Sequence, residues 1–507
     1  MKYFFGFLML IACFFTSAQS PTIKHYISTQ KNQHRWLKQY EEFLAIPNVL
    51  GDSANILRNA NWIKALLELN GVKSQLLHSV RVGSAPVVFG EVVTPGATTT
   101  IAFYAHYDGQ PVNPKQWAEG LAPFTPVLLT DRLDKGGKII SFPDDKEVIN
   151  PQWRLYGRGS SDDKAGVFAI IAAYESIIAT GLKPSINIKF FFEGEEEAGS
   201  INLAEIFKTN KNILKADQWI ICDGPQHITG NKQILFGARG DVNLDIKTYG
   251  AKRPLHSGNY GNWAPNPAMR LAQLLASMKD KSGMVTIKGF YDDITPFTEI
   301  EKKAIRSIPN TDDILKRDLL VSQPDGNGKS LTELLTLPTL NINGIQSANV
   351  GSMAANVIPT EAIAVVDLRL VLGNDVDKQV KKVMDHIRSE GYQIIDHEPT
   401  DEERMQFPLL AKVEKRGKGY NAQRTPMDLP LALKVITAVE TTIDYNVIRV
   451  PSLGGSLPLY LFEQLLQTKP IILPIVNYDN NQHAENENLL LNYLWEGIET
   501  MAAVMRM

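Results

Sequence analysis

Residues 165–192 read AGVFAIIAAYESIIATGLKPSINIKFFF and join two different apolar patterns in direct succession. The first part, residues 165–180, is predicted to be a helix that Gly181 ends. The second part, residues 186–192, is a short apolar run bounded by turn-forming residues, which is typical of a strand covered on both faces. A helix followed directly by such a strand predicts an α/β fold.

Further apolar runs extend this pattern along the chain. They lie at residues 101–105, 219–222 and 471–473, and each is followed by polar residues of the kind that bind ligands. These runs read as buried strands interleaved with helices, so we predict an α/β domain with a mixed sheet.

The pattern of apolar and polar residues changes near residue 241. Residues 242–246 and 362–370 alternate between apolar and polar side chains, which suits a sheet with one solvated face. Because ligand-like residues follow strands both before and after this part, we predict that residues 241–424 form a second, α+β domain inserted into the first. The first domain would then consist of the two flanking parts, residues 19–240 and 425–507. A length of 507 residues agrees with two domains.

Composition limits the choice of partner. The formal net charge is −3 from 52 basic and 55 acidic residues, which gives no electrostatic reason to expect a nucleic acid or an anionic membrane. A small, nearly neutral substrate fits better. The two cysteines, Cys13 and Cys222, leave no disulfide to form once the first is removed or modified.

The amino terminus has the pattern of a secretory signal peptide. Lys2 precedes an apolar stretch at residues 4–15, and small residues follow up to Ala18. We expect cleavage after Ala18, so that residues 1–18 are lost and the protein is exported to the periplasm or secreted. The alternative is a lipoprotein signal in which Cys13 is lipidated. No stretch reaches the roughly 18 to 20 uninterrupted apolar residues of a transmembrane span.

Two short motifs follow the early part of the predicted sheet. His106 and Asp108 come directly after the run at 101–105, and residues two apart in an extended chain point to the same side, so the carboxylate can orient the imidazole. Asp162 and Asp163 stand together just before the predicted helix. A surface loop is the usual explanation of the first motif when it is taken alone, and a helix N-cap explains one of the two aspartates but not both.

Acidic residues also follow the later strands. Four glutamates, Glu193 and residues 195–197, crowd at the end of the run at 186–192, where unpaired charge is costly unless a cation or hydrogen bonds compensate it. A solvated acidic turn is the simpler alternative. Asp223 follows the run at 219–222, and a histidine, His483, follows the last apolar run, at 471–473.

Taken together, these residues supply imidazole and carboxylate groups from loops at the carboxyl ends of strands, where open α/β sheets place their active sites. Nitrogen and oxygen ligands without thiolates suit zinc, and manganese or cobalt would also be accommodated. The candidate metal ligands are His106, Asp162, Glu197, Asp223 and His483.

The combined motifs resemble the di-zinc peptidase family that includes carnosine dipeptidases, aminoacylases, glutamate carboxypeptidases and succinyl-diaminopimelate desuccinylase. The resemblance is closest to the dipeptidase branch and covers nearly the whole mature chain. It implies two zinc ions per subunit, a bridging role for Asp162, and a cis peptide between Asp162 and Asp163. His106 and Asp223 would hold one zinc, and Glu197 and His483 the other. Glu196 would be the general base, and Asp108 would be a further catalytic residue that orients the His106 imidazole.

The resemblance extends to the inserted domain, which in the family acts as a lid and forms a homodimer. It implies that His256, in the segment Leu-His-Ser-Gly at residues 255–258, stabilises the oxyanion from the partner subunit. Arg369 would hold a substrate carboxylate. Asn356 and the loop residues Gly455 and Ser456 would also contact the substrate.

These implications predict metal-dependent hydrolysis of dipeptides or short peptides that end in a free carboxylate, by a zinc-activated water with Glu196 as base. An N-acyl-amino-acid amidohydrolase would use the same metal ligands, and a non-catalytic binding protein on this fold is a further alternative. The sequence departs from the resembled family in segments expected to touch the substrate. Asn356 replaces a common threonine, and Ser452 and Leu453 stand where an arginine and an acid are common.

Overall fold

The computed structural model describes residues 21–507. The predicted signal peptide, residues 1–18, and Cys13 lie outside the described residues. Among residues 21–507, no helix is both long enough and apolar enough to cross a membrane. Cys222 is buried and free.

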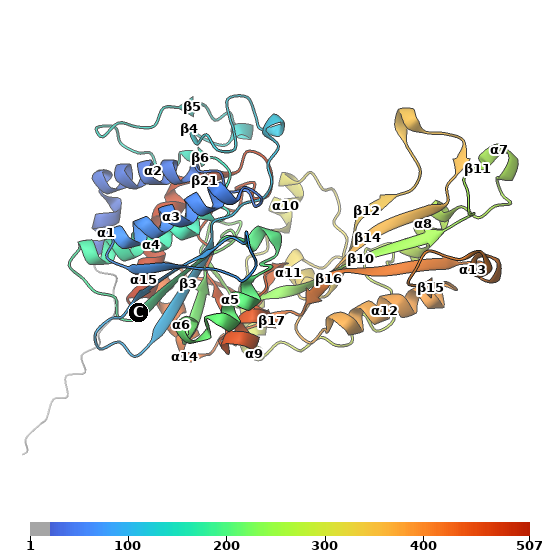
Figure 1. The fold of residues 1–507 in the computed structure, drawn as a ribbon. Helices are drawn as coiled ribbons and strands as arrows, with labels where there is room; N and C mark the ends of the chain where they lie inside the picture. The colour runs from blue at the N-terminus through green and yellow to red at the C-terminus, as the bar shows by residue number, and fades with distance from the viewer. Residues whose placement is uncertain (1–20) are drawn as a thin grey trace, which may run out of the picture.

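An eight-stranded mixed sheet forms the centre of the larger lobe, on the left of Figure 1. Four strands, β7, β3, β8 and β20, run parallel next to one another, so their carboxyl ends meet at one edge. In spatial order the strands are β1 (Lys73–Leu77), β2 (Val87–Val92), β7 (Asn187–Glu193), β3 (Thr100–His106), β8 (Gln218–Ile221), β20 (Ile471–Ile472), β9 (Gln233–Leu235) and β18 (Ile448–Val450).

Helices cover both faces of this sheet because side chains alternate along its strands. Phe190 and Phe192 of β7 enter one core cluster, whereas Phe191 enters the cluster on the opposite face. The first cluster is closed by α1 (Pro21–Ser28), α2 (Gln30–Leu44), α3 (Ser53–Leu69), α4 (Lys164–Ala179), α14 (Pro430–Glu440) and α15 (Leu491–Met505). The second is closed by α5 (Leu203–Thr209), α6 (Lys211–Leu214) and the π-helix η5 (Phe462–Leu466). The predicted α/β fold with a mixed sheet is confirmed.

Helix α4 matches the helix predicted at residues 165–180 to within one residue. The Asp163 carboxylate caps it by accepting a hydrogen bond from the Gly166 backbone N–H, at 3.3 Å. The helix ends before Gly181, whose φ of 74° suits glycine. The start of α4 is therefore tied to the pair of aspartates that precedes it.

A second sheet forms the smaller lobe, on the right of Figure 1. Val242, Leu244 and Ile246 of its long central strand point into a separate core, and alternate residues do not, as the pattern at 242–246 predicted. The strands are β12 (Thr339–Gln346), β14 (Glu361–Leu370), β10 (Gly237–Tyr249), β16 (Leu410–Tyr420) and β15 (Gln393–Ile395). Helices α8 (Pro267–Ser277) and α12 (Val376–Ser389) contribute to its core.

Strand β10 connects the two lobes. Its first residues pair with β17 (Gln423–Arg424) and β19 (Leu453–Ser456), and the rest pairs with β14 and β16. The strand begins four residues before the predicted limit at 241, so the limits 241 and 424 remain a prediction. Helices α9 (Glu299–Ser307), α10 (Asp312–Asp318) and α11 (Leu331–Leu335) lie where the lobes meet (Figure 1).

Smaller elements complete the fold. A four-stranded sheet beside the larger lobe contains β21 (Asn488–Leu490), β6 (Arg154–Tyr156), β4 (Val127–Leu129) and β5 (Ile139–Ile140). The far end of the smaller lobe carries β11 (Leu255–His256), β13 (Val357–Ile358), α7 (Ser257–Tyr260) and α13 (Asp401–Gln406). Short 3₁₀ turns are η1 (Pro114–Gln116), η2 (Leu133–Lys135), η3 (Glu196–Ala198) and η4 (Gly351–Met353).

Candidate metal centre

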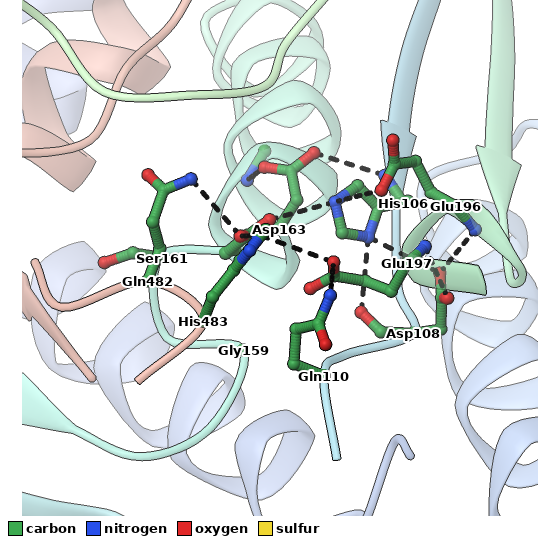
Figure 2. A network of polar contacts seen from close by, with 12 residues as sticks. His106, Asp108, Gln110, Gly159, Ser161, Asp163, Glu196, Glu197, Gln482 and His483 are labelled. Carbon is green, nitrogen blue, oxygen red and sulfur yellow. Dashed lines mark hydrogen bonds and ion pairs between the residues drawn. The ribbon is translucent and has the colours of Figure 1, made fainter. Parts of the chain in front are cut away.

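The carboxyl ends of the parallel strands bring the predicted ligand residues together. His106 is the last residue of β3 and lies in register with Glu193 at the end of β7. Asp223 follows β8 by two residues. Figure 2 shows His106 and His483 beside the acidic side chains that reach them from separate loops. Residues that are far apart in sequence therefore form one cluster at the edge of the sheet.

The cluster divides into two groups of potential ligand atoms, each within 4.8 Å of one another. His106, Asp163 and Asp223 form one group, and Asp162, Glu197 and His483 form the other. The Asp162 carboxylate lies between them, with Oδ1 3.0 Å from His106 Nε2 and Oδ2 3.0 Å from His483 Nε2. This arrangement offers two adjacent cation sites, with Asp162 placed to contact both.

The turn that presents Asp162 contains a cis peptide bond between Asp162 and Asp163, as predicted. Asp163, which was not among the predicted ligands, is buried, caps α4 and accepts a hydrogen bond from the His106 backbone N–H at 3.2 Å. Burial, reinforced by neighbouring Asp223, raises the pKa of Asp163. Asp163 therefore joins the helix start to the strand that carries His106.

Asp108 orients both halves of the cluster. Its Oδ1 lies 3.4 Å from Nδ1 of the His106 imidazole, and its backbone carbonyl oxygen lies 3.2 Å from the same nitrogen. The two carboxylate oxygens also accept hydrogen bonds from the backbone N–H groups of Glu196 and Glu197, at 3.1 and 3.0 Å. Asp108 thus holds the imidazole and the acidic turn in one geometry (Figure 2).

The cluster has more negative charge than its own imidazoles can balance. Burial, reinforced by Asp162, raises the pKa of Glu197 to about 7. Burial also raises the pKa of Asp223 to about 6, although His106 opposes the shift. Asp162 behaves differently, because hydrogen bonds from the two histidines outweigh its burial and lower its pKa. Divalent cations would relieve this repulsion, so the donor set fits a metal centre.

A buried carboxylate shapes the loop that carries Asp162. Glu487 is fully buried and accepts hydrogen bonds from the backbone N–H groups of Gly159, Ser161 and Asp162, at 2.8 to 3.0 Å. The Arg158 guanidinium also donates a hydrogen bond to this carboxylate, at 2.7 Å. The sequence shows an acid at this position, but no local pattern indicates that it faces a loop more than 300 residues earlier.

Two glutamines also contact the cluster without having been predicted. Gln110 donates a hydrogen bond to Glu197 Oε2 at 2.8 Å, and Gln482 donates to Asp162 Oδ2 at 3.4 Å. Each lies one or two residues from a predicted site residue, and that proximity is the one signal that could have found them.

Comparison with known proteins identifies the group to which this geometry belongs. The model of peptidase family M20/M25/M40 matches residues 102–507. The chain belongs to this family. It is accordingly a metal-dependent hydrolase that acts on peptide bonds, and the predicted family and enzyme class are confirmed.

Relatives within the M20 family align along most of their length. The Cys-Gly metallodipeptidase DUG1 of Candida albicans is 27% identical over 494 residues, which cover 93% of this chain and 94% of the relative. The human Beta-Ala-His dipeptidase is 26% identical over 424 residues, covering 82% and 76%. The M20 family metallo-carboxypeptidase Sso-CP2 from Sulfolobus solfataricus has a similar structure, with a TM-score of 0.74 and 27% identity over 93% of this chain and 98% of that chain.

Three of the predicted substrate residues of this M20 peptidase lie together at the junction of the lobes. Arg369 on β14 and Ser456 on β19 both belong to strands that pair with β10, and Gly455 precedes Ser456. Arg369 Nε lies 3.1 Å from Asp367 and 3.6 Å from Asp241. The guanidinium is therefore already held between two carboxylates.

The other two predicted residues, His256 and Asn356, lie elsewhere. Both are exposed at the far end of the smaller lobe, where the Ser257 N–H donates to the Asn356 carbonyl oxygen at 3.1 Å. His256 Nδ1 accepts a hydrogen bond from the Gly258 N–H at 3.1 Å. Figure 1 places β11 and α7, the elements around His256, away from the larger lobe. Within one chain these residues do not reach the metal cluster.

Proposed function

We propose that this M20 peptidase hydrolyses the amide bond of dipeptides or short peptides that end in a free carboxylate. The observation that carries this proposal is the cluster of imidazole and carboxylate groups at the edge of the sheet, with Glu196 beside it. The dipeptidase relatives support the substrate class, since the names of two of them specify a dipeptide.

The five predicted ligands would hold two zinc ions. His106 and Asp223 would bind one ion, Glu197 and His483 the other, and Asp162 both. Imidazole and carboxylate donors favour zinc, and manganese or cobalt would also suit them. When bound, such a metal pair polarises the scissile carbonyl and makes water a stronger nucleophile at neutral pH.

Glu196 is the residue we assign as general base. Its Oε2 lies 3.9 Å from His106 Nε2, and its backbone N–H is fixed by Asp108. Burial is the largest of the effects that raise the pKa of the Glu196 carboxyl well above its usual range. A higher pKa makes this carboxylate a stronger base toward a proton of water. Glu196 would take a proton from the attacking water and deliver it to the leaving amine.

A panel of substrates tests the proposed function. Purified protein, supplied with zinc, manganese or cobalt in turn, is assayed on dipeptides, tripeptides and N-acyl amino acids. We expect the highest kcat/KM on dipeptides. A higher kcat/KM on N-acyl amino acids would identify an amidohydrolase with the same ligands, and no hydrolysis of any substrate would refute the proposal.

Arg369 should make a free carboxylate important for binding. A guanidinium can donate two parallel hydrogen bonds to a carboxylate, and charge-assisted bonds are worth about 1.5 to 3 kcal/mol. We therefore expect kcat/KM to fall by about tenfold to a hundredfold when the carboxylate of a good dipeptide is amidated. Arg369→Lys should keep part of the preference and Arg369→Met should lose it. Equal kcat/KM for free and amidated substrates in the wild type would contradict the assignment.

His256 would complete the site of a partner subunit. We propose a homodimer through the smaller lobe, in which His256 donates a hydrogen bond to the oxyanion of the tetrahedral intermediate. Its exposure at the far end of that lobe supports this placement, since an exposed imidazole is free to reach a neighbour. The alternative is a histidine that only caps the Ser-Gly turn through its bond to Gly258.

Mixed dimers separate these two alternatives. A dimer of one Glu196→Ala protomer and one His256→Ala protomer has one doubly damaged site and one intact site if His256 acts across the interface. Two inactive homodimers, unfolded and reassembled together, should then recover about one quarter of the wild-type activity, since half the dimers are mixed and half their sites work. No recovery when mixed dimers are demonstrably present would contradict the partner role.

Export completes the proposal. The amino-terminal pattern described above supports removal of residues 1–18, with lipidation at Cys13 as the alternative. Mass spectrometry of the mature protein decides between them. A free amino terminus at Gln19 agrees with cleavage after Ala18, and an acylated Cys13 agrees with a lipid anchor.

A further inference from the structure

A cavity of about 400 Å³ lies where the two lobes meet. Its wall is formed by the ends of β9 and β18, by the segment 451–454 and by helices α9, α10 and α11. Most of the lining is apolar, including Leu235, Phe297, Leu315, Leu335 and Leu453. The volume lies within the range of pockets that bind small ligands.

Two parts of the cavity wall lie close in sequence to predicted metal ligands. Pro225, in its wall, follows the ligand Asp223 by two residues and forms a parallel bridge with Val476. Tyr478, also in the wall, lies five residues before the ligand His483. The loops that carry two of the metal ligands therefore continue directly into the cavity wall.

The predicted substrate loop forms another part of the same wall. Leu453 and Gly454 line the cavity and belong to β19 together with Gly455 and Ser456. Gly454 packs so closely against α11 that an added Cβ would lie 2.9 Å from Leu335 Cδ2. Arg239 Nε donates a hydrogen bond to the Gly454 carbonyl oxygen at 2.8 Å and holds the loop from the other side. A substrate held by this loop would have the cavity beside it.

The cavity offers no free charge. Within the described chain its wall carries no aspartate, glutamate or lysine. Its one arginine, Arg424, is paired with buried Glu301 at 2.8 Å and stacks over Phe297. Its one histidine, His227, has a pKa lowered by burial, which favours the neutral imidazole. An ionised group that entered here would lose its hydration without gaining a partner, which is costly.

We propose that this cavity is a specificity pocket for an uncharged, apolar side chain of the peptide substrate. The inference rests on the proposed function and narrows its substrate class to dipeptides with a large apolar residue. Leu453 is central to it, because this residue lines the cavity and lies on the same strand, β19, as Gly455 and Ser456. Here the position presents a hydrocarbon side chain to the cavity.

Two matched substrate series test the pocket in the wild-type enzyme. One series varies the first residue and the other the second, with alanine at the constant position and Ala, Leu, Phe, Asp or Lys at the variable one. In the series whose variable side chain enters the cavity, kcat/KM for Leu or Phe should exceed that for Asp or Lys by about tenfold or more. Hydrolysis without such a preference in either series overturns the pocket but not the peptidase. No hydrolysis of any dipeptide overturns both.

A charge placed in the wall should invert the preference. Leu453→Glu is expected to lower kcat/KM for the Phe substrate and raise it for the Lys substrate, because the new carboxylate pairs with the ammonium. Leu433→Glu, on α14 with Leu433 47% exposed, is the matched control and should retain the wild-type ratio. An unchanged Phe-to-Lys ratio in a folded, metal-loaded Leu453→Glu enzyme would overturn the assignment.

A second variant covers the case in which Leu453→Glu does not fold. Thr332→Phe adds bulk to the α11 wall without adding charge. It should lower kcat/KM for the Phe substrate by about tenfold and leave the Ala substrate nearly unchanged. Equal effects on both substrates would mean that the cavity does not receive the side chain.

Discussion

Glu196→Gln is expected to lower kcat by about 10² to 10⁴-fold while both metal equivalents stay bound. The amide has the size of the carboxylate but cannot accept the proton of the attacking water. The backbone contact that fixes residue 196 is an N–H bond to Asp108, which the substitution leaves in place. Steady-state kinetics and metal analysis of the same preparation measure the two quantities.

Glu197→Gln is the matched control, because it makes the same chemical change at the next residue. Glu197 belongs to the group with Asp162 and His483, so its loss should reduce metal occupancy. Added metal should then restore part of the activity of Glu197→Gln but none of the activity of Glu196→Gln. If Glu196→Gln turned over within a few-fold of the wild type, the general base would have to be another group.

Metal removal should abolish hydrolysis completely. Asp162 lies between the two ligand groups, and without cations the carboxylates of the cluster repel one another. We expect a chelator to remove all activity and about two equivalents of a divalent metal to restore it, as a two-metal site requires. Isothermal titration of the chelated protein gives the stoichiometry independently of activity.

Thermal unfolding provides a second readout of the same experiment. A ligand that binds only the folded state stabilises it, so Tm should rise on metal addition and level off once both sites are filled. Asp162→Asn should weaken this rise more than Gln110→Ala, because Asp162 contacts both groups and Gln110 contacts Glu197 alone. Full activity with a demonstrably empty site would refute the metal assignment.

Local patterns in the sequence were sufficient to predict the main elements of the larger lobe. The helix at residues 165–180 and the strand at 186–192 appear as α4 and β7, since continuous apolar runs of these lengths form such elements when buried. The alternation at 242–246 was also confirmed in β10, because one face of that sheet meets a core and the other does not. The limits of the inserted domain are harder to predict from the sequence, because strand β10 runs through both lobes without a break.

The resemblance to a family predicted which residues are candidate metal ligands, but it could not show what surrounds them. Glu487 and Gln110 escaped prediction because each acts through a contact that depends on folding. Glu487 reaches backbone N–H groups more than 300 residues earlier in the chain. The pairing of Arg369 with Asp241 could not be predicted from the sequence either. It exists because the two residues lie in register on neighbouring strands of the folded sheet.

The sequence by itself determined the chemistry of this protein, because residue types fix which groups can bind a metal, accept a proton or hold a carboxylate. Its periodicity also determined the class of fold, since apolar runs must be buried wherever they lie. Tertiary structure alone decided how these groups combine. The parallel strands placed His106 and Asp223 at one edge, and a cavity without free charge formed where the two lobes meet, from segments distant in sequence. Such contacts arise from packing between remote segments, and no local pattern encodes them.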